Sequence, residues 1–138
     1  MNFVTAVKTC LSNYATFHGR APRSEFWWFY LFIVLVDVVL SFFIGSETFV
    51  AIRDGGFDAI SVAVASNRAV MVQGIVHLAL FLPMLAVSVR RLHDVGRSGW
   101  WLLVAIIPLG IFVVLYWWLR PTEPRPNAYG MPPLLPAP

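Results

Sequence analysis

Residues 26–45 read FWWFYLFIVLVDVVLSFFIG, and this stretch decides the class of the fold. A helix of about 20 residues is about 30 Å long, which matches the hydrocarbon core of a bilayer. The stretch opens with five aromatic residues, from Phe26 to Tyr30. Amphipathic aromatic rings are typical of the boundary between lipid and water. The sequence therefore predicts a transmembrane helix over about 26–45.

Two further stretches have the same character, at about 69–89 and about 100–119. The whole chain is 59% apolar and 12% charged, whereas soluble domains are roughly 45–50% apolar and about 25% charged. We therefore predict an all-α membrane protein of about three transmembrane helices, with membrane lipids as its surroundings. A net charge of +3 is too small to indicate nucleic acid as a partner.

The segments outside these spans lead to three expectations. Residues 2–17 carry apolar side chains at helical spacing, which predicts an amphipathic helix that lies in the membrane interface or packs on its own bundle. The loop at 46–68 contains an apolar stretch too short to cross, which is either an interfacial segment or an extension of the second helix. Residues 1–120 are expected to form one membrane domain, and the Pro-rich tail 121–138 to be extended and mostly unfolded.

The positions of the basic residues predict an orientation. Lys8, Arg20 and Arg23 precede the first span, and the segment between the second and third spans adds three arginines. The opposite side of the membrane would hold four basic residues, which are Arg53, Arg68, Arg120 and Arg125. Because basic residues are enriched on the cytoplasmic side, we expect a multi-pass membrane protein with a cytoplasmic N-terminus and an external C-terminus.

Two basic motifs would meet at one membrane face, at residues 20–25 and 90–97. Arginine binds phosphate and carboxylate groups with two parallel hydrogen bonds. One interpretation is a site for anionic lipid head groups or a partner protein, and the other is anchoring of the helix ends. The candidate site residues are Arg20, Arg23, Arg90, Arg91, His93, Asp94 and Arg97.

Asp37 and His77 form a second candidate constellation, inside the membrane. Asp37 lies 11 residues from Phe26 and His77 lies 12 residues from Val89, so both are roughly 16–18 Å deep. Antiparallel helices would bring them to the same level. They form either a polar contact between helices, or an ion or proton relay in an oligomeric transporter or channel, which is the alternative function.

Signatures of enzymes and metal sites are missing from the sequence. Cys10 is the one cysteine, so an internal disulfide or a paired-cysteine metal site is excluded. We therefore expect no catalytic residues, no metal and no cofactor. A lipid-acting enzyme using His93 and Asp94 is the weakest alternative.

Three sequence motifs resemble the DUF805 family of small bacterial inner-membrane proteins. They are Phe17-x-Gly19-Arg20-x-x-Arg23-Ser24-Glu25-Phe26-Trp27, Arg90-Arg91-Leu92-His93-Asp94-x-Gly96-Arg97-Ser98-Gly99-Trp100-Trp101 and Asn127-x-Tyr129-Gly130. The resemblance implies a membrane location and implies no reaction. The resemblance does not distinguish between a membrane lipid, a partner protein and a homo-oligomer as what the arginine motifs bind.

Overall fold

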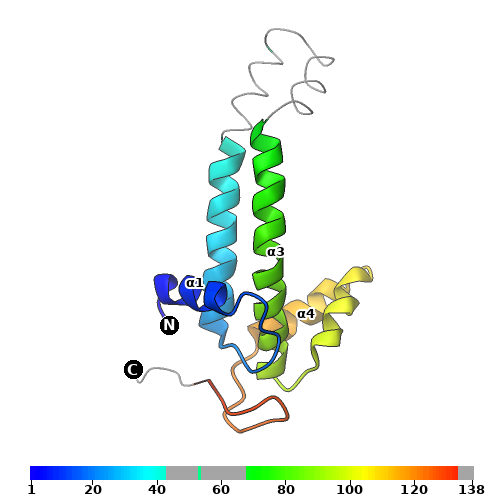
Figure 1. The fold of residues 1–138 in the computed structure, drawn as a ribbon. Helices are drawn as coiled ribbons and strands as arrows, with labels where there is room; N and C mark the ends of the chain where they lie inside the picture. Colours follow the sequence, from blue (N-terminus) through cyan, green and yellow to red (C-terminus); the bar gives the residue numbers. More distant parts are fainter. Residues whose placement is uncertain (43–52, 54–67, 134–138) are drawn as a thin grey trace. The chain divides into compact units, whose positions relative to one another are not determined.

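The computed structural model describes residues 1–42, Arg53 and residues 68–133 (Figure 1). Its elements are helical; the only β-pairing among the described residues is an isolated bridge between Asn127 and Gly130. The predicted loop at 46–68 falls outside the described residues except for Arg53 and Arg68. The helices are α1 (Phe3–Ser12), a helix over Arg23–Phe42, α3 (Arg68–Asp94), the 3₁₀-helix η1 (Gly99–Ile106) and α4 (Gly110–Leu119).

The chain divides into two compact units. Unit 1 comprises Met1–Tyr30 and the described residues from Leu82 onward, and unit 2 comprises the described residues of Leu31–Phe81. The sequence predicted a single domain that excluded the tail, whereas the structure places the described part of the tail, residues 121–133, in unit 1. Both long helices contribute residues to both units.

The first two predicted spans coincide with the two long helices. Arg23–Phe42 and Met71–Asp94 are long and apolar enough to cross a membrane, with mean hydropathies of 1.8 and 2.0. Many of their apolar side chains are exposed, including Leu35, Val38 and Leu78. Exposed apolar residues along the whole length of a helix are expected where lipid is the solvent.

The second helix is longer than predicted, because α3 continues past Val89 to Asp94. The motif Arg90–Asp94 is therefore the last helical turn and not part of a loop. Gly96, two residues after the end of the helix, terminates it with a φ of +71°. The amide of Arg97 donates to the carbonyl of Leu92, and the amide of Gly96 donates to that of His93. This is a Schellman motif, which requires a left-handed residue that glycine supplies without steric cost.

The third predicted span, 100–119, is not one helix. It consists of η1, a break at residues 107–109 and α4. Pro108 cannot donate a helical hydrogen bond, and Leu109 has a φ of +67°. A Cβ on Gly110 would lie 1.8 Å from the carbonyl oxygen of Val104, so the two pieces approach each other too closely for any other residue. Neither piece has the 18 residues that a straight span needs.

Helix α1 packs on the rest of unit 1. Asn2 caps it by accepting a hydrogen bond from the amide of Thr5 at 2.8 Å. Ala6 and Cys10 are fully buried, and the Phe3 ring meets Trp28 edge to face at 5.9 Å. The helix ends at Ser12, earlier than the predicted residue 17, because Asn13 caps it. The structure thus shows packing of Ala6 and Cys10 on the bundle, while Val4 and Leu11 stay exposed. A position in the membrane interface stays a prediction.

Candidate functional site

Asp94 lies at the centre of the arginine motifs. Its two carboxylate oxygens accept from Arg20 at 3.0 Å and from Arg91, whose position one turn earlier on α3 faces the same side. All three side chains are almost completely buried. One carboxylate therefore pairs with two guanidinium groups, and it joins the segment before the first long helix to the end of α3.

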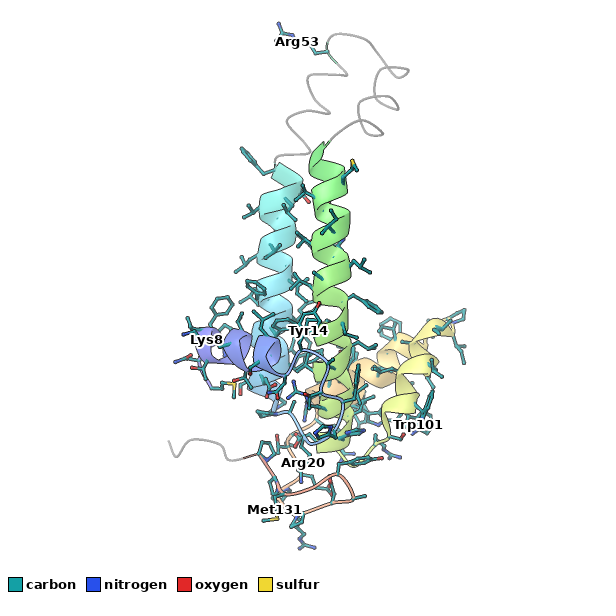
Figure 2. All side chains as sticks on the ribbon, in the orientation of Figure 1. Lys8, Tyr14, Arg20, Arg53, Trp101 and Met131 are labelled. Carbon is teal, nitrogen blue, oxygen red and sulfur yellow. The ribbon has the colours of Figure 1, made fainter. Side chains whose placement is uncertain are left out.

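The end of α4 and the tail supply the remaining acceptors for these two arginines. Arg20, which is labelled beside the tail in Figure 2, also donates to the carbonyls of Glu123, Arg125 and Gly130, the second of these at 2.9 Å. Arg91 donates to the carbonyls of Trp118, in α4, and of Arg120, the C-cap of α4. The prediction of a mostly unfolded tail is wrong for residues 121–133. Backbone carbonyls can satisfy buried guanidinium donors, and here the Pro-rich tail provides three of them for Arg20.

Arg90 faces a separate partner, Glu25. The two side chains are buried and their atoms are 2.8 Å apart. The thiol of Cys10 donates to the same carboxylate at 3.6 Å. Burial, together with the negative charge of Glu25, raises the pKa of Cys10 to about 12. Two nitrogens of Arg90 have no acceptor among the described residues, so this is the least compensated charge of the cluster.

His93 holds the tail by its ring and its backbone. The imidazole stacks on Tyr129 with centroids 3.9 Å apart and an interplanar angle of 2°. Its Nδ1 pairs with the carbonyl oxygen of Gly19 at 3.2 Å, and its own carbonyl accepts from Asn127 at 2.9 Å. Asn127 and Tyr129 were missing from the predicted site, and the motif Asn127-x-Tyr129-Gly130 is the signal that could have found them.

Only Arg23 and Arg97 remain exposed among the five predicted arginines. The guanidinium of Arg97 lies over the ring of Trp117, 5.3 Å from its centroid. Arg23 donates one hydrogen bond, to the carbonyl of Leu119 at 3.3 Å. It borders a hollow of about 410 Å³, whose other lining residues are Pro22, Ser24, Pro121 and Thr122. The hollow is therefore lined by Arg23 and by two residues with hydroxyl groups, Ser24 and Thr122. It lies at the first turn of the helix that begins at Arg23.

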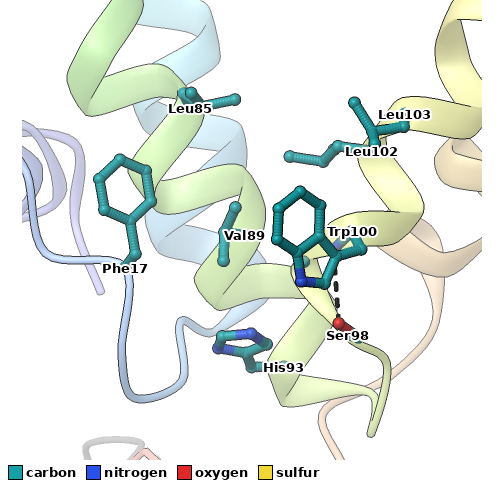
Figure 3. Close-up of a pocket in the computed structure, with 9 residues that line it drawn as sticks. Phe17, Leu85, Val89, His93, Ser98, Trp100, Leu102 and Leu103 are labelled. Atoms are coloured by element: carbon teal, nitrogen blue, oxygen red, sulfur yellow. Dashed lines mark hydrogen bonds between the residues drawn. The ribbon is translucent and has the colours of Figure 1, made fainter.

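An apolar groove of about 510 Å³ also lies in unit 1. His93 and Ser98 lie at one end of it, and Leu85, Leu102 and Leu103 lie at the other (Figure 3). Phe17, Val89, Gly99 and Trp100 complete the lining. A Cβ on Gly99 would meet Val89 at 2.7 Å, so glycine is needed where η1 begins against α3.

Unit 2 brings the predicted intramembrane pair together. The His77 Nε2 and Asp37 Oδ1 atoms are 2.5 Å apart, and the two side chains are 49% and 37% exposed. Neither residue has another hydrogen-bond partner among the described residues. This pair differs from the arginine cluster because it is not buried by the protein around it.

No three His, Cys, Asp or Glu side chains within the described ranges gather as ligands of a metal ion would. In unit 1, Asp94 and Glu25 pair with arginines, and the Glu123 carboxylate accepts from the side-chain amide of Asn127. We therefore name no metal-binding or catalytic residue.

Known proteins resemble the chain over nearly its full length. Two inner membrane proteins of Escherichia coli K12 are similar: YhaH is 33% identical over 127 residues, which cover 91% of this chain and 93% of that protein. YhaI is 31% identical over 124 residues, or 89% of this chain and 90% of that protein. No solved structure matches it. With its two long apolar helices, the chain is an integral membrane protein of the inner membrane. The family model described as "Protein of unknown function (DUF805)" matches residues 14–131, and the chain therefore belongs to the DUF805 family.

Proposed function

We propose that this inner-membrane protein binds the phosphate group of an anionic phospholipid in the hollow beside Arg23. The observation that carries the proposal is the exposed guanidinium at this hollow, with the Ser24 and Thr122 side chains on its walls. Of the five arginines in the two motifs, Arg20, Arg90 and Arg91 are buried against carboxylates. They therefore hold the fold together. Of the two accessible arginines, Arg97 lies over the Trp117 ring, so ligand binding is assigned to Arg23.

The chemistry of the hollow suits a phosphate group. Most donors of Arg23 remain available for two parallel hydrogen bonds to phosphate oxygens. The helix that begins at Arg23 adds free backbone amides and the positive end of its dipole. The aromatic residues Trp27, Trp28 and Tyr30 follow in the next turn, which favours a position at the lipid head groups. A membrane lipid is therefore a better ligand for this hollow than a soluble anion.

The apolar groove supports the same class of ligand. Its walls are mainly aliphatic and aromatic, and its polar groups, His93 and Ser98, are confined to one end. A site that is apolar with a few polar groups at one end suits an amphipathic molecule. We assign the groove to an acyl chain, and the binding role involves no chemical step.

The orientation of the protein follows from the same charges. We infer a multi-pass protein with its N-terminus in the cytoplasm. The carbonyls of Arg125 and Arg120 accept from Arg20 and Arg91, so eight of the ten basic residues would lie on that side and two, Arg53 and Arg68, on the other. The anionic lipids of the cytoplasmic leaflet would then face Arg23. Accessibility of a cysteine placed at residue 2 to an impermeant reagent tests this: labelling in intact spheroplasts would contradict it.

The lipid proposal is tested with the full chain in nanodiscs that contain either phosphatidylglycerol or phosphatidylcholine. Native mass spectrometry counts the retained lipid. Arg23→Ala should weaken retention of phosphatidylglycerol about fivefold, the effect of about 1 kcal/mol per basic residue at a lipid surface. Arg125→Ala is the matched control, since it removes an equal, exposed charge outside the hollow. Equal losses in the two variants, or no preference for phosphatidylglycerol, would overturn the proposal.

The second candidate function is an ion or proton relay through Asp37 and His77. The contact of 2.5 Å between their side chains favours it, because ionisable residues inside membrane helices commonly mark ion pathways. Proton flux into liposomes loaded with a pH-sensitive dye measures it. Flux that survives Asp37→Asn, or no flux above protein-free liposomes, would contradict this candidate.

A further inference from the structure

We propose that the face of unit 2 that carries Asp37 and His77 binds a second copy of this chain. The proposal does not rest on lipid binding at Arg23, which concerns unit 1. It begins from the exposure of the pair: half of the His77 side chain and more than a third of the Asp37 side chain are uncovered.

The surroundings of the pair are apolar and exposed. Val34, one turn before Asp37, is 37% exposed, and Phe81, one turn after His77, is 61% exposed. These residues belong to the two helices that are long enough to cross the membrane. A carboxylate and an imidazole in such a helix face the interior of a bundle or a water-filled cavity, and very rarely lipid. Another protein surface is therefore needed to cover them.

The free atoms of the pair are complementary to those of an identical pair. His77 uses Nε2 and Asp37 uses Oδ1, which leaves the other ring nitrogen and the other carboxylate oxygen without a partner among the described residues. A twofold axis brings each free nitrogen to the free oxygen of the other copy, because in such an interface every contact occurs twice. One kind of partner, a second copy, thus satisfies both groups at once.

Gly74 makes a close approach of the second copy feasible. It precedes His77 by three residues, on the same side of α3, and a Cβ there would meet nothing within 4 Å. Small residues at this kind of position let membrane helices pack with their backbones near one another. Gln73, four residues before His77, adds another side chain that can donate and accept hydrogen bonds across the interface.

Cysteine cross-linking in lipid tests the interface. In full-length protein with Cys10→Ala, Gly74→Cys should form a disulfide-linked dimer in liposomes after mild oxidation. Ile75→Cys is the matched control: this neighbouring position is also exposed and points to another side of the helix. Cross-linking of both variants alike, or of neither, would overturn the proposal.

An exchange of the two polar residues tests their role. Asp37→His and His77→Asp each create a pair of like groups, so each should weaken dimerisation in nanodiscs or liposomes at least tenfold. The double variant restores one group of each kind and should return dimerisation to within about threefold of the wild type, as double-mutant cycles detect for coupled residues. Single variants that dimerise like the wild type, or a wild type that is monomeric when pure and cross-links only to a different protein in native membranes, would refute the second copy as partner.

Discussion

Units 1 and 2 differ in how deeply their polar side chains are buried and in how many partners these side chains have. In unit 1, Asp94 is fully buried and its carboxylate pairs with two arginines, while carbonyls at the end of α4 and in the tail accept from their remaining donors. In unit 2, Asp37 has one partner and remains more than one-third exposed. Both are aspartates on long helices of one small protein, so the difference comes from their neighbours and not from their own chemistry.

The contrast separates structural charges from charges available for function. A buried ion pair costs desolvation energy, and breaking it by removing one partner leaves the other charge uncompensated. Such groups are committed to the fold. Groups that keep free hydrogen-bonding atoms, such as Asp37, His77 and Arg23, can still bind another molecule. The largest effects of mutation on stability are therefore expected in unit 1, and the largest effects on association in unit 2.

The strongest test of this contrast makes the same substitution, aspartate to asparagine, once in each unit. Asp94→Asn should lower the free energy of unfolding by about 3–5 kcal/mol, because it leaves Arg20 and Arg91 buried without a counter-charge. Asp37→Asn should cost only about 0.6 kcal/mol, the mean for a polar contact between membrane helices. Denaturation in micelles, followed by tryptophan fluorescence, measures both.

Glu123→Gln is the control for the loss of a negative charge, because Glu123 is an exposed carboxylate in the tail. This variant should change the free energy of unfolding by less than about 1 kcal/mol. Equal destabilisation by Asp94→Asn and Asp37→Asn would show that the two units do not differ in the way described.

Substitution of one glycine in each unit compares how closely the two units are packed. Gly110→Ala should destabilise the protein by about 1–3 kcal/mol, since the new methyl group meets the Val104 carbonyl and overpacking has costs of this size. Gly74→Ala has open space around it and should stabilise α3 by up to about 1 kcal/mol in the monomer. The same unfolding assay reads both, and effects of the same sign would count against the assignment of close packing to unit 1 alone.

The smallest expected effect concerns Cys10. A pKa of about 12, against 9.0 for an unperturbed thiol, leaves about 1,000-fold less of the reactive thiolate at pH 8. Alkylation by iodoacetamide should therefore be very slow in the folded protein and fast after unfolding in SDS.

The stability linked to this thiol has a definite sign. Because the pKa of Cys10 is higher in the folded state, the thiol contributes fully to the free energy of unfolding below about pH 9. This contribution is lost as the pH rises toward 12. Rapid labelling of the folded protein at pH 8 would contradict the burial of Cys10 beside Glu25.

The arginine motifs show how far the sequence alone could lead. Their residues and their location near one end of the membrane helices followed from charge and hydropathy, and the family resemblance covers the same motifs. Their division into buried and exposed members did not follow. Arg90 and Arg91 are neighbours in sequence, yet Arg90 pairs with Glu25 and Arg91 with Asp94, because successive positions of a helix point about 100° apart.

By itself, the sequence determined the class of this protein and two of its membrane helices, because about 20 successive apolar residues have few stable environments other than a bilayer. It also determined that Asp37 and His77 could meet, since helical rise converts sequence distance into depth. Only the tertiary structure decided that the third apolar segment breaks at Leu109 and that the tail is held by Arg20. Those outcomes depend on contacts between residues distant in the chain, such as the 74 positions that separate Arg20 from Asp94, and no local pattern encodes which buried donor will meet which acceptor.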